Sequence, residues 1–103
     1  MSEIFRTFDP AAASDRETYF QLTSMVIPRP IAWVSTLAPD GTMNLAPFSF
    51  TTVLSSDPPI VCFISSGVKH SLENARETGD FVYNIGDLPL LEQLNQTAAD
   101  LYR

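Results

Sequence analysis

The sequence contains one cysteine, Cys62, and one histidine, His70, among its 103 residues. A single cysteine excludes a disulfide within the chain, and one cysteine with one histidine provides too few ligands for a structural zinc site. Cys62 also lies inside an apolar, strand-like segment, where a free thiol usually packs as a small hydrophobe. We therefore expect neither a metal centre nor a catalytic thiol.

Charged residues are scarce as well. They make up 17% of the chain, and the formal net charge is −6 at pH 7. This negative charge argues against general binding to nucleic acid or to anionic membranes. Apolar residues make up 45% of the chain, a composition typical of a globular protein. Because so few residues are charged, much of the surface must be neutral or apolar, which favours a subunit interface.

Two kinds of targeting segment are also missing. The first ten residues, MSEIFRTFDP, lack the basic flank and the apolar core of a signal peptide. No apolar run approaches the length of a membrane-spanning helix. We expect a cytoplasmic protein without a membrane partner, folded as a single small domain over residues 1–103.

The most informative segment that is present runs from Ile60 to Asn74, IVCFISSGVKHSLEN. An apolar strand leads there into small hydroxyl residues and a lysine, and a helix follows at once. Free backbone N–H groups, the positive end of the helix dipole and the ammonium group of Lys69 would point to the same place. The pattern therefore indicates an anion site, and in particular a bound phosphate. The alternative is that the serines only cap the helix.

Local signals divide the chain into short helices and strands. Ser14 with Glu17 forms a capping box, which predicts a helix that runs to about Ser24. Pro47 lies in a strand-like run and indicates an edge strand, a bulge or an irregular stretch. Gly79 is expected to stop a second helix. That helix covers residues 71–78, and the predicted strands cover 31–37, 44–54, 60–64 and 81–85, the first two forming a hairpin about a turn at 39–42.

A last helix is expected after Asp87, which would cap it. Its apolar residues fall at spacings of three and four and form one stripe for core packing: Leu91, Leu94, Ala98 and Leu101. Four strands with three short helices indicate an antiparallel β-barrel or half-barrel. Four strands can hardly close a filled barrel. The chain is therefore expected to be half of a larger domain, or a protomer that needs a partner.

Five segments stand in a characteristic order: PRPIAWVST (28–36), DGTMNLAPFSF (40–50), DPP (57–59), KHS with Asn74 (69–74) and GDFVYNI (79–85). Together they resemble the flavin reductase-like, FMN-binding split-barrel family, over roughly residues 20–100 in register. The resemblance implies a mainly β fold, an antiparallel, Greek-key-like split barrel with short helices. It also implies a homodimer that holds FMN at the subunit interface, and NAD(P)H as the electron donor.

The resemblance also assigns cofactor-binding residues. Lys69 and Ser71 would hold the FMN phosphate with Ser65 and Ser66 beside them, which agrees with the anion site indicated by the bare sequence. The residues along the isoalloxazine and ribityl chain would be Ala46, Pro47, Phe48, Ser49 and Phe50. Ser35 and Thr36 would be hydroxyl donors on the neighbouring strand, and Arg29 a second positive charge near the cofactor.

Each of these assignments has a simpler alternative. Phe48, Phe50 and Trp33 can be core aromatics, and Ser49 can be the polar half of a strand alternation. Arg29 can be a solvated loop cation. No acid–base pair is evident in the sequence, so no catalytic residue is assigned; in such proteins the cofactor carries the chemistry.

The sequence departs from the family pattern in one important respect. Family members are usually longer, and many carry a Gly-Asp-His segment linked with nicotinamide binding, which is not found in this chain. The chain is thus expected to represent an incomplete barrel that holds the phosphate side of the flavin site. The first hypothesis is an FMN-dependent oxidoreductase that uses NAD(P)H. The alternative is a flavin-binding electron carrier, or a truncated domain, without reductase turnover.

Overall fold

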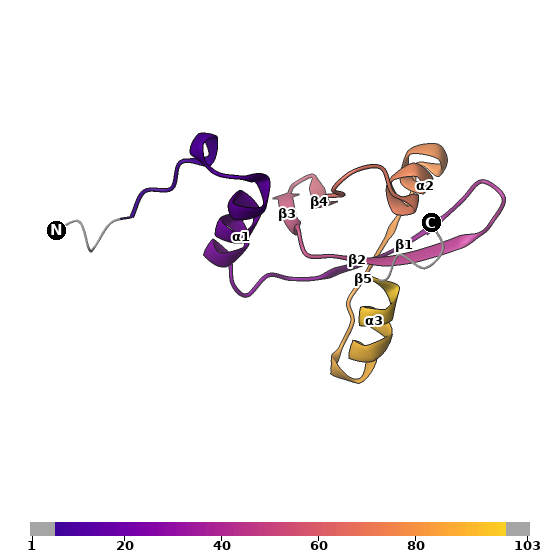
Figure 1. Ribbon diagram of the computed structural model, residues 1–103. Helices are drawn as coiled ribbons and strands as arrows, with labels where there is room; N and C mark the ends of the chain where they lie inside the picture. The colour runs from indigo at the N-terminus through magenta and orange to yellow at the C-terminus, as the bar shows by residue number, and fades with distance from the viewer. Residues whose placement is uncertain (1–5, 99–103) are drawn as a thin grey trace.

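The computed structural model describes residues 6–98 of the chain. Short helices alternate with antiparallel strands, as predicted (Figure 1). The elements are a 3-10 turn η1 (Pro10–Ala12), α1 (Asp15–Met25), β1 (Ala32–Leu37), β2 (Met43–Phe48), β3 (Thr51–Ser56), β4 (Pro59–Phe63), α2 (His70–Thr78), β5 (Val82–Asn84), a 3-10 turn η2 (Leu88–Leu90) and α3 (Leu91–Thr97).

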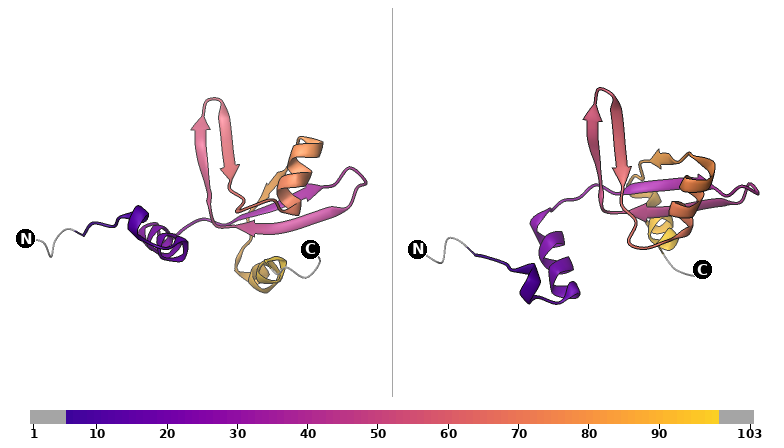
Figure 2. Two further views of the ribbon diagram at one scale, coloured as in Figure 1. Left: turned by 45° about the horizontal axis from the view of Figure 1, so that its top comes forward. Right: turned by 90° about the horizontal axis from the view of Figure 1, so that it is seen from above.

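The main sheet has the strand order β2-β1-β5, and both pairings are antiparallel. Helices α2 and α3 lie on opposite faces of this sheet (Figure 2). Successive residues of a strand point to opposite faces. Thr36 of β1 accordingly bonds to α2, whereas Trp33 donates its indole N–H to Thr97 at the end of α3, at 3.0 Å. The central strand therefore holds a helix on each side.

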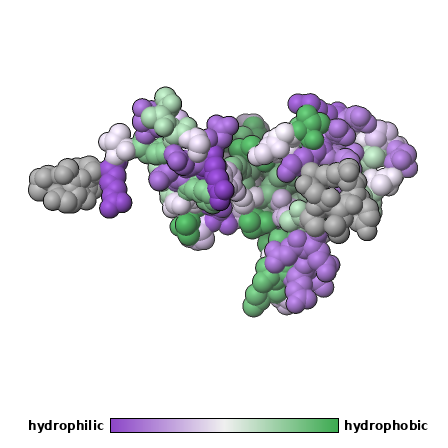
Figure 3. Space-filling model, viewed as in Figure 1, coloured by the Kyte–Doolittle hydropathy of each residue, from purple (hydrophilic) through white to green (hydrophobic). Residues whose placement is uncertain are grey.

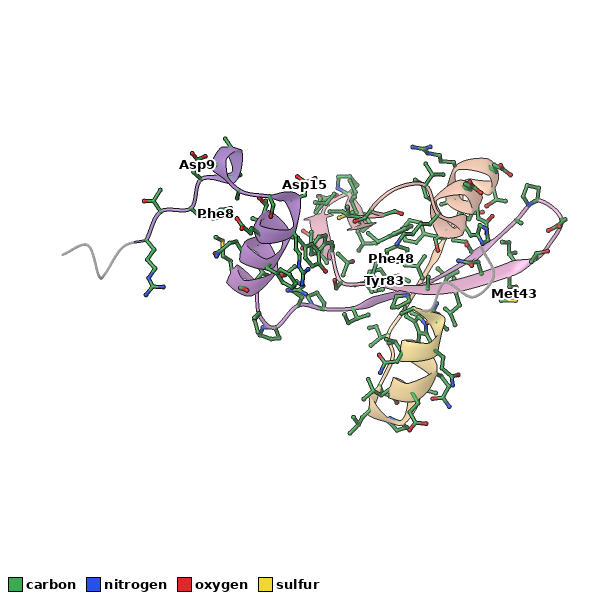
Figure 4. All side chains as sticks on the ribbon, in the orientation of Figure 1. Phe8, Asp9, Asp15, Met43, Phe48 and Tyr83 are labelled. Carbon is green, nitrogen blue, oxygen red and sulfur yellow. The ribbon has the colours of Figure 1, made fainter. Side chains whose placement is uncertain are left out.

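The apolar core lies on the α2 face of the sheet. It is formed by Ala32, Val34, Ala46 and Phe48, against which Phe63 and Tyr83 pack. The Phe48 and Phe63 rings lie 4.8 Å apart between centroids. Phe48 and Tyr83 can be followed above the sheet in Figure 4. All four buried members of this cluster come from β1 and β2, so this hairpin organises the fold.

A second, two-stranded sheet pairs β3 with β4. The prediction of one strand over 44–54 was wrong here, because the chain bends at Ser49 and Phe50 and forms two strands. β2 has by then used its pairing partner in full, since Ala32, the first residue of β1, lies opposite Phe48. β3 pairs instead with β4, and the described chain has five strands rather than four.

Pro47 lies inside β2, opposite Trp33. β2 is at the edge of the described sheet, so the missing N–H of Pro47 removes no ladder bond toward a further strand. The edge position was one of the three predicted possibilities for this proline, and it is confirmed. The irregular stretch comes two residues later, at Ser49.

The helix ends test the local signals one by one. The Ser14 hydroxyl accepts from the Glu17 N–H at 3.1 Å, so the predicted cap is confirmed. Gly79 ends α2 with φ of 81°, the left-handed conformation expected of a C-terminal glycine. The prediction for Asp87 was wrong. Its side chain makes no capping bond, and η2 separates it from α3. Pro89 lies inside η2 and favours a 3-10 turn there.

The predicted apolar stripe of the last helix is buried only in part. Leu94 is half-buried and approaches Gly86, whereas Leu91 and Ala98 are exposed. Leu101 lies outside the described residues. No helix within residues 6–98 has both the length and the apolar character required to cross a membrane.

Candidate functional site

The loop between β4 and α2 carries three of the predicted phosphate-binding residues. Ser65 and Lys69 are half-buried and Ser66 is exposed. The Ser65 hydroxyl donates to the Gly67 carbonyl at 2.8 Å, and Gly67 has φ of 91°, which a residue with a side chain rarely adopts. These two features fold the loop back just before the helix.

Lys69 is the N-cap residue of α2, and its side chain makes no capping hydrogen bond. The serines do not cap this helix, so the simpler alternative for the segment does not account for them. The first intrahelical bond runs from the Glu73 N–H to the Lys69 carbonyl at 3.0 Å. The N–H groups of the preceding turn have no partner inside the helix and carry the positive end of its dipole. A lysine thus stands at the N-terminus of this helix.

The Ser71 side chain points inward, toward the β1–β2 hairpin. It is only 1% exposed, and its hydroxyl oxygen accepts from the Asn44 side-chain amide at 2.8 Å. Its side chain is therefore engaged under the helix in this structure. The group that Ser71 offers to the outside is its backbone N–H in the first turn of α2.

An apolar cavity of about 340 Å³ lies between α1, the bend after β2 and the end of β4. Three predicted cofactor residues line it: Arg29, Ser49 and Phe50. Cys62 and Ile64 close its other side, together with Leu22, Met25 and Val26 of the α1 end. The structure thus brings together residues from three segments that are distant in the sequence.

Arg29 is not a solvated loop cation. Its guanidinium donates to the Thr23 carbonyl at 2.6 Å and to the Val26 carbonyl at 3.2 Å, and it lies over the Phe50 ring at 5.8 Å from the centroid. The Nε–H group is buried without a hydrogen-bond partner among the described residues. Such a donor is costly unless a further acceptor reaches it.

The loop follows the cavity wall directly in the chain. The Ile64 N–H donates to the Phe50 carbonyl at 2.9 Å, so the chain leaves the cavity wall at Ile64 and enters the loop at Ser65. Arg29 thus lines the cavity, and Lys69 stands at the end of the loop that follows the cavity wall. An apolar cavity with one cation and a helix N-terminus with another suit an anionic ligand with an apolar portion.

The other predicted residues lie elsewhere or are engaged inside the protein. Ala46 and Phe48 are buried in the core, so their side chains do not face a ligand site; Pro47 is half-buried on the opposite face. The Thr36 hydroxyl accepts from Asn74 at 3.1 Å, and the Ser35 hydroxyl from Asn84 at 3.1 Å. Ser35 and Thr36 also line a separate cavity of about 520 Å³ beside β5. Phe48 is therefore a core aromatic, whereas Phe50 forms part of the wall of the 340 Å³ cavity.

Comparison with known proteins tests the family resemblance. Residues 24–102 match the family described as the flavin reductase like domain. The chain belongs to the flavin reductase-like family. Over 98 residues it is 43% identical to the uncharacterized protein YwrF of Bacillus subtilis (strain 168), covering 91% of this chain and 48% of YwrF.

Solved structures confirm the split-barrel fold of this flavin reductase-like chain. Nitrilotriacetate monooxygenase component B from Bacillus cereus is similar with a TM-score of 0.85 and 31% identity, covering 94% of this chain and 50% of that one. A split barrel domain protein from Shewanella frigidimarina NCIMB 400 has a TM-score of 0.79 at 24% identity, covering 96% and 52%, and supports the fold alone. The chain thus spans about half the length of the relatives it matches.

Sequence reasoning gave no role to two residues that the structure places at the centre of this flavin reductase-like domain. Asn44 and Asn74 donate the bonds to Ser71 and Thr36. The available signal was the spacing of Ser71 and Asn74, which puts two polar residues on one face of a helix that must dock on a sheet.

Proposed function

We propose that this chain binds FMN and forms part of a flavin reductase that takes electrons from NAD(P)H. The observation that supports this proposal best is the N-terminus of α2 with Lys69, one loop after the wall of an apolar cavity, in a chain that belongs to the flavin reductase-like family. The apolar cavity would take the ring system, and the N-terminus of α2 with Lys69 would take the phosphate.

The residues present fit this cofactor. The cavity volume of about 340 Å³ falls in the range of small-molecule sites. Arg29 places a cation in the cavity wall, and its buried Nε–H has no hydrogen-bond partner among the described residues. Lys69 at the N-terminus of α2 is also informative in a chain of net charge −6, because it is the only lysine. Ser65 and Ser66 would add hydroxyl groups beside the phosphate, as would the backbone N–H of Ser71.

When bound, the flavin would supply the capacity to accept and release electrons, and the protein would position it. The roles of this chain's residues would then be binding and orientation: Lys69 would neutralise the phosphate, Arg29 would supply positive charge at the cavity wall, and the apolar wall would exclude water. A second candidate function is an electron carrier that binds flavin without reductase turnover.

We further propose a cytoplasmic homodimer that holds FMN at its interface. Apolar surface is exposed around the β3–β4 hairpin, and one side of α3 is apolar (Figure 3). Open strand edges and apolar patches of this kind favour association with another chain. Light scattering with and without FMN tests this proposal, and a monodisperse monomer under both conditions would contradict it.

The FMN proposal is tested by Lys69→Ala. Loss of a charge-assisted hydrogen bond to a phosphate costs about 1.5–3 kcal/mol, so we expect FMN affinity to fall about ten- to a hundredfold in fluorescence quenching titrations. Riboflavin, which lacks the phosphate, should bind the variant as it binds the wild type. Arg76→Ala is the matched control, because Arg76 is a cation in the last turn of the same helix. Equal FMN affinity of wild type and Lys69→Ala would refute the phosphate site.

Anaerobic stopped-flow reduction of the FMN-loaded chain by NADH separates the two candidate functions. Poor positioning of a hydride donor lowers a rate by orders of magnitude. We expect residues 1–103 to bind FMN but to be reduced far more slowly than a longer flavin reductase of this family. Rapid, saturable bleaching by NADH would show that this chain alone suffices for the reductase reaction.

A further inference from the structure

Four polar side chains meet between α2 and the β1–β2 hairpin, and we call them the polar cluster: Thr36, Asn44, Ser71 and Asn74. Thr36 and Asn44 are directly opposite each other in the β1–β2 ladder. Ser71 and Asn74 are three residues apart on α2. The Asn44 amide donates to Ser71 at 2.8 Å, and the Asn74 amide donates to Thr36 at 3.1 Å. Each strand of the hairpin is thus bonded to α2 once.

The polar cluster is the buried face of this helix. Ser71 and Asn74 are the only residues of α2 that are buried, at 1% and 9% exposure. A helix on a sheet usually docks through an apolar stripe, which stabilises it without fixing its direction. Hydrogen bonds contribute less net stability, but they depend strongly on distance and angle. Docking α2 through two such bonds therefore fixes its rotation and its position along the hairpin.

That orientation matters at one end of the helix. Ser71 is in the first turn, two residues after the N-cap Lys69, so the Asn44 bond acts directly on the turn whose N–H groups are unpaired. The Asn74 bond holds the next turn and prevents rotation about the first contact. The dipole axis, the free N–H groups and the Lys69 backbone are then held at a constant angle to the sheet. The backbone bond from Ile64 to Phe50 ties the cavity wall to the loop that leads into α2.

We infer that the polar cluster is a positioning device for the phosphate site, so that Asn44 and Asn74 set the preference for FMN over riboflavin. This inference rests on the proposed function. Neither asparagine touches the proposed ligand surface; both act through α2. A residue of this kind should change the recognition of the phosphate while leaving the recognition of the ring unchanged. A general loss of stability would instead weaken the binding of both flavins to the same degree.

The test measures the affinities of FMN and of riboflavin for the full chain and for two variants, Asn74→Leu and Asn44→Ala. We expect the ratio of the two affinities to fall about fivefold in each variant, the effect of one ordinary hydrogen bond. Asn44 is half-buried, so Asn44→Ala keeps its fold and carries the test if Asn74→Leu does not. Thr97→Val is the matched control, because it removes the long-range bond to Trp33 under α3 and should leave the ratio unchanged.

Amide hydrogen exchange without any flavin provides the second measurement. We expect faster exchange in the first turn of α2 in both variants, with unchanged exchange in β1, and no change at α2 in Thr97→Val. A wild type that prefers FMN, together with variants that keep the same ratio and the same exchange, would overturn the inference and leave the proposed function intact. A wild type that binds FMN no better than riboflavin would overturn the proposed function, and exchange would then decide whether the polar cluster orients α2.

Discussion

The two sheets of this domain are built from strands of similar apolar character, yet they differ sharply in burial. In the β2-β1-β5 sheet, Val34 and Ala32 have no exposed surface. In the β3–β4 hairpin, Val53 is 67% exposed and no residue is buried. The difference arises from what packs on each sheet, because α2 and α3 pack on the first, whereas an open cavity lies between the second and α1 (Figure 1). Strand propensity forms a hairpin, but only a second layer forms a core.

The largest expected effect comes from placing the same charge in both sheets. Val34→Asp buries an uncompensated carboxylate, which costs about 3 kcal/mol or more and removes much of the stability of a small domain. Val53→Asp changes an exposed position and should alter the free energy of unfolding by no more than about 0.5 kcal/mol. Thermal denaturation followed by circular dichroism compares them. An equal loss from Val53→Asp would contradict the comparison and show that a partner covers the hairpin.

A smaller difference is expected between α1, which is not packed on the main sheet, and α2, which is. α1 has no buried residue, so loss of its cap in Ser14→Ala should cost about 1 kcal/mol within that helix only. Helical circular dichroism should decrease, while fluorescence of the buried Trp33 melts as in the wild type. Gly79→Ala is the control, since a similar strain at the end of docked α2 should shift the Trp33 transition as well. Equal Trp33 shifts in both variants would show that α1 is coupled to the sheet.

The smallest effect concerns the turn that closes β1 on β2. The Thr42 N–H donates to Asp40 at 2.9 Å, and this bond, with a second from the Thr42 side chain, lowers the pKa of Asp40. A carboxyl group whose pKa is lowered by folding stabilises the folded state above its unfolded pKa, and this stability is lost as the pH falls toward the folded pKa.

Asp40→Asn keeps a side-chain acceptor for the turn but removes the titration. We expect the variant to be slightly less stable than wild type at neutral pH, with a difference that vanishes in acid. Urea denaturation midpoints of wild type and variant, at neutral pH and in acid, measure this difference in stability. A difference that persists unchanged in acid would assign the loss to the turn geometry rather than to the charge.

Local physics accounts for the features that were predicted correctly. The Ser14 cap, the Gly79 stop and the edge position of Pro47 each depend on a few neighbouring residues. The break at Ser49 and Phe50 could not be found in this way, because both residues are compatible with a strand. It depends on where β1 begins, and therefore on a pairing between segments that the chain brings together only on folding.

The candidate site also combines a feature that local sequence signals predict with features that depend on distant segments. The placement of Lys69 at a helix N-terminus followed from the strand, loop and helix signals around it. The inward orientation of Ser71 did not, because the rotation of α2 is set by Asn44, which is 27 residues away. The half-buried position of Arg29 could not be predicted from local signals either, since its hydrogen-bond partners are the carbonyls at the end of α1.

Lys69 has one further consequence, which concerns covalent chemistry. Because it is the only lysine, the chain offers a single side-chain primary amine, and that amine belongs to the residue that we propose to hold the phosphate. An amine-selective acylating reagent therefore modifies this position and the α-amino group, and peptide mass mapping distinguishes the two. The extent to which FMN protects Lys69 from acylation, with the α-amino group as an internal reference, would report occupancy of the site in a mixture where neither colour nor turnover can be observed.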